Sequence, residues 1–172
     1  VFKNYKNTQK VAVVMNQSLD ELSLINQYFS PDFFQLHGEE DLDYILKLRQ
    51  KFPNIGIIKA ISVSNKDDII HAKNFAQSVD FLLFDNKNAG SGESFEWDWL
   101  KGFELDKPWF LSGGINSSNL EIILKNPAIK FIDISSGIEE TKGIKSLKLI
   151  LLASRIFFIS TTNISECLAS WK

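Results

Sequence analysis

Cysteine is almost absent from this chain, because Cys167 is the only one among 172 residues. A single thiol excludes a disulfide framework within the chain. The two histidines do not cluster with it at the spacing of a zinc site. We therefore expect no metal, no disulfide and a reducing compartment, the cytosol.

The chain also lacks an excess of charge of either sign. The 19 basic and 21 acidic residues give a net charge of -2, and such a balance provides no basic surface for nucleic acid or an anionic membrane. Residues 1–16 show no basic stretch followed by an apolar one, which a secretory signal needs. The apolar run from Leu147 to Ile159 contains Lys148 and Arg155 and is too short to span a bilayer. We therefore expect neither nucleic acid nor a membrane as a partner.

What the sequence does contain is a regular alternation of short apolar, β-branched runs with longer amphipathic stretches of helical period. The amphipathic stretches include residues 18–29 and 39–51. The expected strands are 11–15, 32–36, 55–61, 79–85, 108–112 and 130–135.

Helix-start signals stand between several of these runs. Ser18 and Glu21 form the pattern of a capping box before the first amphipathic stretch. Gly38, Ser64 and Asn116 stand where later helices are expected to begin. The boundaries of the alternating segments are thus marked by local sequence.

Apolar strands joined by helical crossovers form a parallel sheet covered by helices. Two architectures fit this pattern, an open doubly wound sheet and a closed (β/α) barrel. About six strand–helix units can be recognised, whereas an eightfold barrel needs eight. The chain also begins with Val1 rather than methionine, which favours a fragment.

An acid follows the most apolar of the expected strands. Phe81–Phe84 is followed by Asp85, and a glycine loop with Gly90 and Gly92 comes next. A buried strand that brings one carboxylate to its carboxyl end, beside a loop that can close over a ligand, is how barrel enzymes place an acid or a base. Alternatively, Asp85 caps the helix that follows.

Two polar residues end the second expected strand. Gln35 and His37 lie on the same side of it, because side chains alternate along a strand. Both are therefore candidates for the rim of a site, and structural hydrogen bonding is the alternative role for each.

Glycine and serine follow the last two expected strands. Backbone N–H groups at paired glycines can approach an anion closely, although paired glycines also form ordinary tight turns. Two such turns side by side fit the phosphate site of a (β/α) barrel. The residues concerned are Ser112, Gly113 and Gly114 at the end of one strand, and Asp133, Ser135, Ser136 and Gly137 at the end of the other.

Taken in order, these blocks resemble the phosphoribosylanthranilate isomerase family of tryptophan biosynthesis. The resemblance implies a (β/α)8 TIM barrel whose first two units are largely missing, with about six present. We assign residues 1–157 to this partial domain and residues 158–172 to a C-terminal extension. The matching blocks are Val11–Asn16, Gln35–Glu40, Ile58–Ala60, Leu82–Asp85, Gly90–Gly92 with Phe95–Trp97, Ser112–Asn116 and Asp133–Glu139.

The resemblance also implies a reaction. It is the Amadori rearrangement of N-(5-phosphoribosyl)anthranilate to 1-(2-carboxyphenylamino)-1-deoxyribulose 5-phosphate, with no metal or organic cofactor. By resemblance, Asp85 is the general acid that protonates the ribose ring oxygen. The resemblance also implies that Gly90–Gly92 forms a mobile cover over the substrate. The remaining implied roles are phosphate binding by the turns at Gly113–Gly114 and Ser135–Gly137, and contact with ribose and anthranilate by Gln35, His37 and Asp133.

The general base of the family is missing from this sequence. In the family it is a cysteine in a Lys-Val-Cys-Gly-Ile-Thr-like block at the end of the first strand. The arginine that the family has after its second strand is missing as well. Cys167 stands in Ser165–Leu168, which does not resemble that block. We therefore expect this chain by itself to be inactive or impaired as an isomerase.

Two other functions remain open. The chain could bind phosphosugars without turning them over, or it could serve as a structural or interaction fragment of a decayed barrel. In either case the strands at 11–15 and 130–135 are expected to be unpaired apolar edges, which favour self-association.

Overall fold

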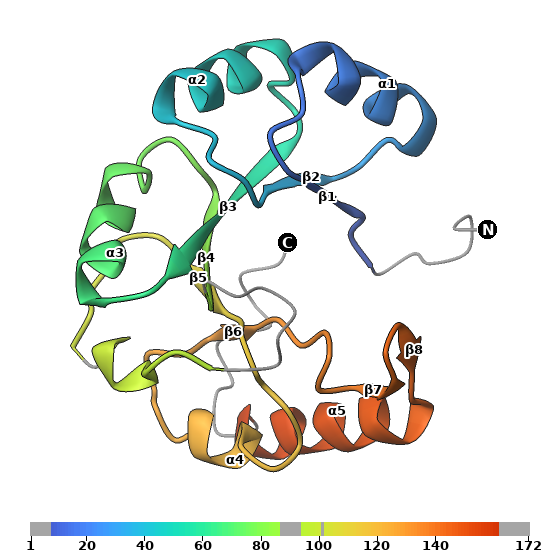
Figure 1. Cartoon of the computed structure of the whole chain (residues 1–172), viewed down its shortest axis with the longest axis vertical. Coiled ribbons are helices and arrows are strands. Elements are labelled where there is room, and N and C mark those ends of the chain that lie inside the picture. Colours follow the sequence, from blue (N-terminus) through green and yellow to red (C-terminus); the bar gives the residue numbers. More distant parts are fainter. Residues whose placement is uncertain (1–7, 87–93, 101, 162–172) are drawn as a thin grey trace. The chain divides into compact units, whose positions relative to one another are not determined.

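The computed structural model describes residues 8–86, 94–100 and 102–161. In these ranges six parallel strands form one sheet in the order β1-β2-β3-β4-β5-β6, and helices connect them (Figure 1). The strands are β1 (Val11–Val14), β2 (Phe33–Leu36), β3 (Gly56–Val63), β4 (Phe81–Asn86), β5 (Trp109–Leu111) and β6 (Phe131–Ile132).

The helices and a hairpin complete the described chain. In the described residues no helix combines the length and the apolar character that a membrane crossing requires. The hairpin joins β7 (Glu139–Thr141) to β8 (Ile144–Lys145) in antiparallel fashion. The helices are α1 (Leu19–Phe29), α2 (Leu42–Lys51), α3 (Lys66–His71), η1 (Ala72–Asn74), η2 (Trp97–Leu100), α4 (Leu120–Ile123) and α5 (Leu147–Thr161).

All six expected strands are confirmed. The last is shorter than predicted, because only Phe131–Ile132 pairs with β5. The hairpin β7–β8 was not predicted. The helix α5 continues past residue 157 to Thr161, and the boundary between a domain at 1–157 and an extension at 158–172 stays a prediction.

The predicted helix starts are confirmed at one place and wrong at three. The capping box of Ser18 and Glu21 is present. The N-cap residues of α2, α3 and α4 are Asp41, Asn65 and Asn119 instead of Gly38, Ser64 and Asn116. Asp41 and Asn65 each accept a hydrogen bond from an N–H of the first helical turn, which a glycine has no side chain to do.

The described chain divides into two compact units. The first comprises residues 8–61, 65–83 and 104–108. In it β2 pairs with β1 and with β3, and Leu36 stands opposite Val14 on one side and Lys59 on the other. Phe34 and Leu36 are fully buried together with Leu22, Ile45 and Leu48 of the helices. The alternation along β2 therefore turns Gln35 to the opposite face of the strand.

The second unit comprises residues 62–64, 84–86, 94–100, 102–103 and 109–161. Its core forms around Phe84 of β4, whose ring meets those of Phe103 and Trp109 edge-on at 5.6 and 5.5 Å between centroids. Leu111 and Leu120 are also fully buried. This packing holds the carboxyl ends of β4 and β5 in place.

Candidate active site

Asp85 is the next-to-last residue of β4, at the carboxyl end of the strand. The residue is 9% exposed, and the strand residues before it, Leu82 to Phe84, are buried. Its Oδ1 accepts a hydrogen bond of 2.8 Å from the backbone N–H of Asn86. In the described residues the next helical turn begins at Trp97, so Asp85 is not the N-cap of that turn. The buried strand with an acid at its end is thus present as predicted.

The turn after β5 passes beside this acid. Gly113 has a φ of 85°, in the left-handed region. A Cβ at Gly113 would lie 2.9 Å from the backbone nitrogen of Asn86 and 3.1 Å from Oδ1 of Asp85. Glycine both adopts this conformation without strain and leaves room for the carboxylate. The turn predicted to bind phosphate and the predicted acid are therefore neighbours.

Ser112 and Asp133 meet at the ends of β5 and β6. The Ser112 hydroxyl donates to Oδ2 of Asp133 at 3.1 Å. Backbone hydrogen bonds of 2.8 Å extend the ladder here, from Ser112 N–H to the Phe84 carbonyl and from Asp133 N–H to the Leu111 carbonyl. The structure thus brings together three predicted residues, Asp85, Ser112 and Asp133, at the ends of three successive strands.

Side chains farther along hold the first glycine turn. Gly114 also has a positive φ, 68°, and its carbonyl accepts hydrogen bonds from the side-chain amides of Asn116 at 3.1 Å and Asn119 at 2.9 Å. The helix α4 begins only at Leu120, so the glycines do not lead directly into a helix as the sequence predicted.

The serine turn lies against the first turn. Gly137 forms a parallel bridge with Asn116, and a side chain on Gly137 would overlap the carbonyl of Ile115. The Lys145 ammonium donates to the carbonyl oxygen of Ser135 at 2.7 Å and to its hydroxyl at 3.2 Å. Lys145 was not predicted as a site residue, because only the hairpin β7–β8 brings it back to this turn.

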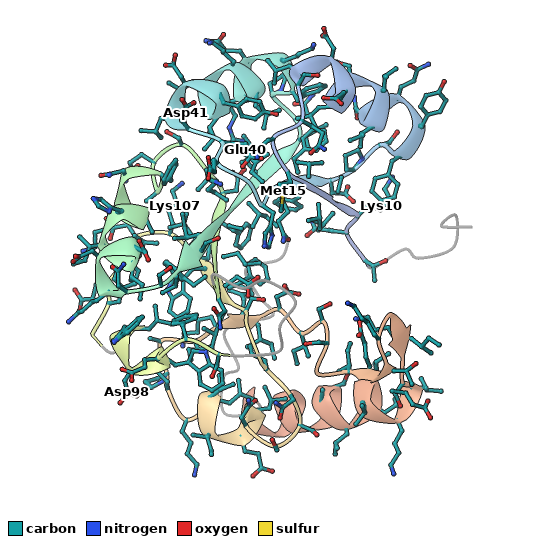
Figure 2. All side chains as sticks on the ribbon, viewed as in Figure 1. Lys10, Met15, Glu40, Asp41, Asp98 and Lys107 are labelled. Atoms are coloured by element: carbon teal, nitrogen blue, oxygen red, sulfur yellow. The ribbon has the colours of Figure 1, made fainter. Side chains whose placement is uncertain are left out.

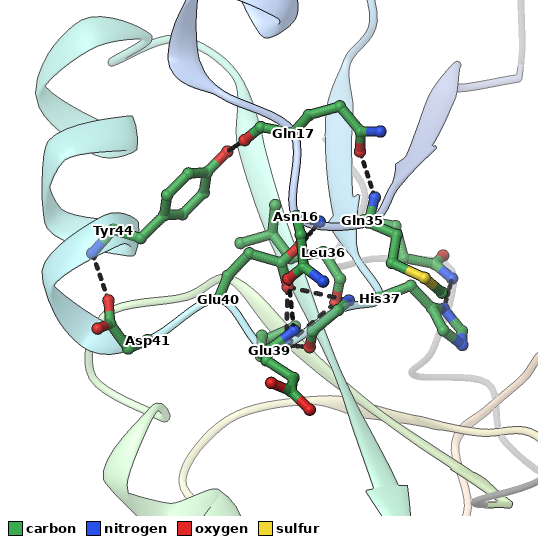
Figure 3. Close-up of polar contacts among 12 residues, drawn as sticks. Asn16, Gln17, Gln35, Leu36, His37, Glu39, Glu40, Asp41 and Tyr44 are labelled. Carbon is green, nitrogen blue, oxygen red and sulfur yellow. Dashed lines mark hydrogen bonds and ion pairs between the residues drawn. The ribbon is translucent and has the colours of Figure 1, made fainter.

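Gln35 and His37 belong to the first unit. The Gln35 side-chain amide lies 3.2 Å from Nδ1 of His37, which confirms that the two residues share one face. The backbone N–H of His37 donates to the Val14 carbonyl at 2.8 Å. Figure 3 shows both residues beside the turn that leads from β2 toward α2.

A buried ion pair lies beside the turn that follows β2, and the sequence did not predict it. The Lys59 ammonium is 3.1 Å from Oε2 of Glu40, and the two side chains are 4% and 2% exposed. Figure 2 labels Glu40 near the end of β1, close to Met15. Lys59 is the only cation in the matched block Ile58–Ala60, and that isolated charge in an apolar strand was the available signal.

The surroundings of the pair determine how its members titrate. Burial by itself raises the pKa of Glu40, but backbone amides at Asn16 and Glu40 and the charge of Lys59 outweigh it and hold the pKa below its ordinary 4.5. Burial lowers the pKa of Lys59, an effect that the Glu40 carboxylate opposes. Burial, followed by the charge of Glu40, raises the pKa of Tyr44 to about 12, and its hydroxyl donates to the Gln17 carbonyl at 2.7 Å.

Some of the residues that the sequence singled out lie outside the described residues. They include Gly90 and Gly92, predicted to form the cover, and Cys167.

The fold and the residues at the strand ends together define the class of protein. A parallel α/β fold that carries an acid and glycine–serine turns at the carboxyl ends of its strands is typical of TIM-barrel enzymes. A family model described as N-(5'phosphoribosyl)anthranilate (PRA) isomerase matches residues 1–154. The chain belongs to this family of TIM-barrel isomerases of tryptophan biosynthesis.

Individual relatives agree with the family assignment. The N-(5'-phosphoribosyl)anthranilate isomerase of Thermoanaerobacter sp. (strain X514) is 36% identical over 147 residues, 83% of this chain and 69% of the relative. The crystal structure of the enzyme from Thermotoga maritima is 27% identical with a TM-score of 0.76, over 89% of this chain and 74% of that chain. A phosphoribosylanthranilate isomerase in complex with reduced 1-(o-carboxyphenylamino)-1-deoxyribulose 5-phosphate is 25% identical with a TM-score of 0.75, over 90% and 74%.

Proposed function

We propose that this chain carries the general-acid and phosphate-binding part of a phosphoribosylanthranilate isomerase site, and that it is inactive or impaired on its own. The proposed reaction converts N-(5-phosphoribosyl)anthranilate into 1-(2-carboxyphenylamino)-1-deoxyribulose 5-phosphate. The observation that carries the proposal is Asp85, a nearly buried carboxyl group at the carboxyl end of β4 beside the Gly113 turn. By the resemblance described above, this is the expected place of the general acid.

In the proposed first step, the Asp85 carboxyl group donates its proton to the ribose ring oxygen. The bond between that oxygen and C1 breaks while the anthranilate nitrogen forms a double bond to C1. A base then removes the proton from C2, which gives an enolamine with a double bond between C1 and C2. Protonation at C1 and loss of the proton from the C2 hydroxyl yield the ketone, so the product is an isomer of the substrate.

The second step needs a base that this sequence does not supply in the way the family does. No block resembling Lys-Val-Cys-Gly-Ile-Thr occurs in the chain. Asp85 and the turns around it could therefore bind the substrate and open the ring, while removal of the C2 proton remains unassisted. Isomerase activity of this chain by itself is expected to be low for that reason.

The substrate phosphate is assigned to the two turns of the second unit. Gly113 and Gly114 hold two successive positive φ values, a conformation that lets backbone N–H groups converge on an anion. The Gly137 bridge to Asn116 places the serine turn alongside, and the Lys145 ammonium, which is paired with Glu139 at 2.8 Å, lies at Ser135. These contacts support the predicted roles of Ser112, Ser135, Ser136 and Gly137 in binding, with Asp133 facing Ser112.

The second candidate is binding without turnover, which the missing base favours. It differs from the first in one measurable respect. A phosphosugar-binding remnant binds the product analogue but shows no rearrangement, even when the missing strands are supplied.

An isomerase assay with two variants tests the acid. The chain is assayed alone and with a peptide carrying the strands that the family has before Val11, and Asp85→Asn is compared with Asp43→Asn. Asp43 is an exposed aspartate of α2, so its variant removes the same charge away from the site. Asp85→Asn is expected to lower activity by about 10²-fold to 10⁴-fold and Asp43→Asn to leave it unchanged.

Calorimetry completes this test. The unmodified chain is expected to bind reduced 1-(o-carboxyphenylamino)-1-deoxyribulose 5-phosphate. Robust activity of the chain alone would contradict the absence of a base, and failure to bind both the analogue and phosphate would contradict the proposed site and leave the structural role.

A further inference from the structure

The Lys59–Glu40 pair has no part in the rearrangement as proposed above. Both charges are almost completely buried, and burying charges costs free energy unless they are paired and hydrogen-bonded. A pair of apolar side chains would stabilise the unit as well, so stability alone does not account for an ion pair at this position. Its location, at the strand ends where Gln35 and His37 lie, suggests a different role.

The pair binds both ends of one residue, Gly38. The Lys59 ammonium donates to the Gly38 carbonyl at 2.6 Å. Oε2 of Glu40, the oxygen that faces Lys59, accepts from the Gly38 N–H at 3.0 Å. A charge-assisted hydrogen bond is stronger than a neutral one, so the backbone on either side of Gly38 is held by an ionised group.

The same carboxylate also contacts the segment that follows β1. Oε1 of Glu40 accepts from the backbone N–H of Asn16 at 2.7 Å, and Asn16 Oδ1 accepts from the Glu39 N–H at 2.7 Å. Figure 3 shows these contacts converging on the turn after β2. Because a Cβ on Gly38 would overlap the Asn16 side chain, the turn can pack this closely only with glycine.

Gly38 directly follows His37, whose Nδ1 contacts the Gln35 side chain. We propose that Lys59 and Glu40 are positioning residues: they fix the Gly38 turn and thereby hold His37 and Gln35 in the orientation in which they meet the substrate. The identity of the ligand that His37 and Gln35 contact rests on the proposed function. The positioning itself rests on the contacts of the first unit.

A carboxylate at the other end of the strands provides a matched control. Asp80 accepts from the Ile57 N–H at 2.7 Å and from Arg49 at 2.9 Å. Like Glu40, it therefore joins a cation to a backbone amide, but it precedes β4 instead of following β2. The Asp80 side chain is 41% exposed, so Asp80→Asn tests what the loss of a contact of this kind at a less buried place does without touching the Gly38 turn.

The experiment compares the wild-type chain with Glu40→Gln, Lys59→Met and Asp80→Asn by NMR. The readouts are the imidazole nitrogen resonances of His37 and the hydrogen exchange of the Gly38 amide. Glu40→Gln is expected to speed Gly38 exchange by about tenfold or more relative to the global exchange rate and to shift the His37 resonances. Asp80→Asn is expected to change neither. The double variant Glu40→Gln/Lys59→Met, which leaves no unpaired charge, keeps the test available if a single variant does not fold.

Ligand titrations separate this inference from the proposed function. Glu40→Gln is expected to weaken binding of the reduced product analogue by about tenfold and to leave binding of inorganic phosphate unchanged. His37 resonances and Gly38 exchange that match wild type in Glu40→Gln and in the double variant would overturn the positioning role. A wild-type chain that does not bind the analogue contradicts the proposed function, and the NMR result still decides the role of the pair.

Discussion

Gly113 shows how one residue connects the acid to the turn beside it. Its positive φ and the small distances that would separate a Cβ from Asn86 and Asp85 have the same cause, a backbone that passes close to the Asp85 carboxylate. Gly38 is in a similar situation, because a Cβ at this position would overlap the side chain of Asn16. At both places glycine is required by close approach at a strand end, and a larger residue would displace the side chain next to it.

Replacing Gly113 by alanine is therefore expected to cost more than replacing Gly102. Both have a positive φ, 85° and 71°, which costs a non-glycine residue about 1–2 kcal/mol. Only Gly113 of the two has atoms in the way, because no atom of the described residues lies within 4 Å of a Cβ at Gly102. Urea unfolding should show a loss of about 1–2 kcal/mol for Gly102→Ala and a larger loss for Gly113→Ala. Equal losses would mean that the turn relaxes away from Asp85.

Sequence reasoning at this scale succeeded where one residue type has a local meaning. Asp85 at the end of an apolar strand and Gln35 with His37 on one face follow from the alternation of side chains. Lys59 was missed because a lysine in a strand gives no indication of its partner. The pairing of Leu36 with Lys59 across β2 and β3 places the ammonium beside the Gly38 turn, and this pairing exists only in the folded sheet.

At the scale of elements, the turns after the strands make specific contacts with other segments. The turn from β2 to α2 contains Gly38, Glu40 and the N-cap Asp41, and Glu40 is hydrogen-bonded to Asn16, which follows β1. The predicted start of α2 at Gly38 was wrong for this reason. The residues before Asp41 are held by the ion pair and by Asn16, so they cannot enter the helix.

The ion pair gives this turn a dependence on pH. Because the pKa of Glu40 is held below 4.5 in the folded chain, the folded state takes up its proton at a lower pH than the unfolded state does. The stabilisation is therefore complete above about pH 4.5 and is lost as the pH falls through the lower folded pKa. Urea unfolding of the wild-type chain between neutral pH and about pH 3 should show this loss.

The variant Glu40→Gln should have a smaller loss of stability over the same acid range. Glu39→Gln is the matched control, because Glu39 is adjacent in sequence and stands outside the buried pair. An acid dependence of Glu40→Gln equal to that of the wild-type chain would contradict the lowered pKa of Glu40.

At the scale of the whole molecule, the sheet order leaves β1 with a single neighbouring strand among the described residues. Val13 on this strand is 64% exposed, and Met15 just after it is 57% exposed. An apolar edge strand is a template for pairing with another chain. We therefore expect the chain to self-associate through β1 as its concentration rises.

Sedimentation velocity over a range of concentrations tests this expectation. Val13→Lys should reduce association, because a charge on an edge strand opposes pairing. Leu24→Lys is the control, since Leu24 is 56% exposed on α1, away from the edge. A wild-type chain that stays monomeric at all concentrations, or equal effects of the two variants, would contradict association through β1.

The scarcity of cysteine in the sequence bears on the proposed reaction at the scale of the whole molecule. No block resembling the family's cysteine block occurs in the given sequence, and the contacts around Asp85 come from residues of β4 and the turn after β5.

The sequence by itself determined the order of strands and helices, the parallel class of the sheet and the candidates at the strand ends, because periodicity and turn residues act over a few positions. Tertiary structure decided which of those candidates meet. It placed Gly113 beside Asp85, returned Lys145 to the serine turn and buried Lys59 against Glu40. These contacts join residues that are separated in the chain, and their partners are set by strand register and packing.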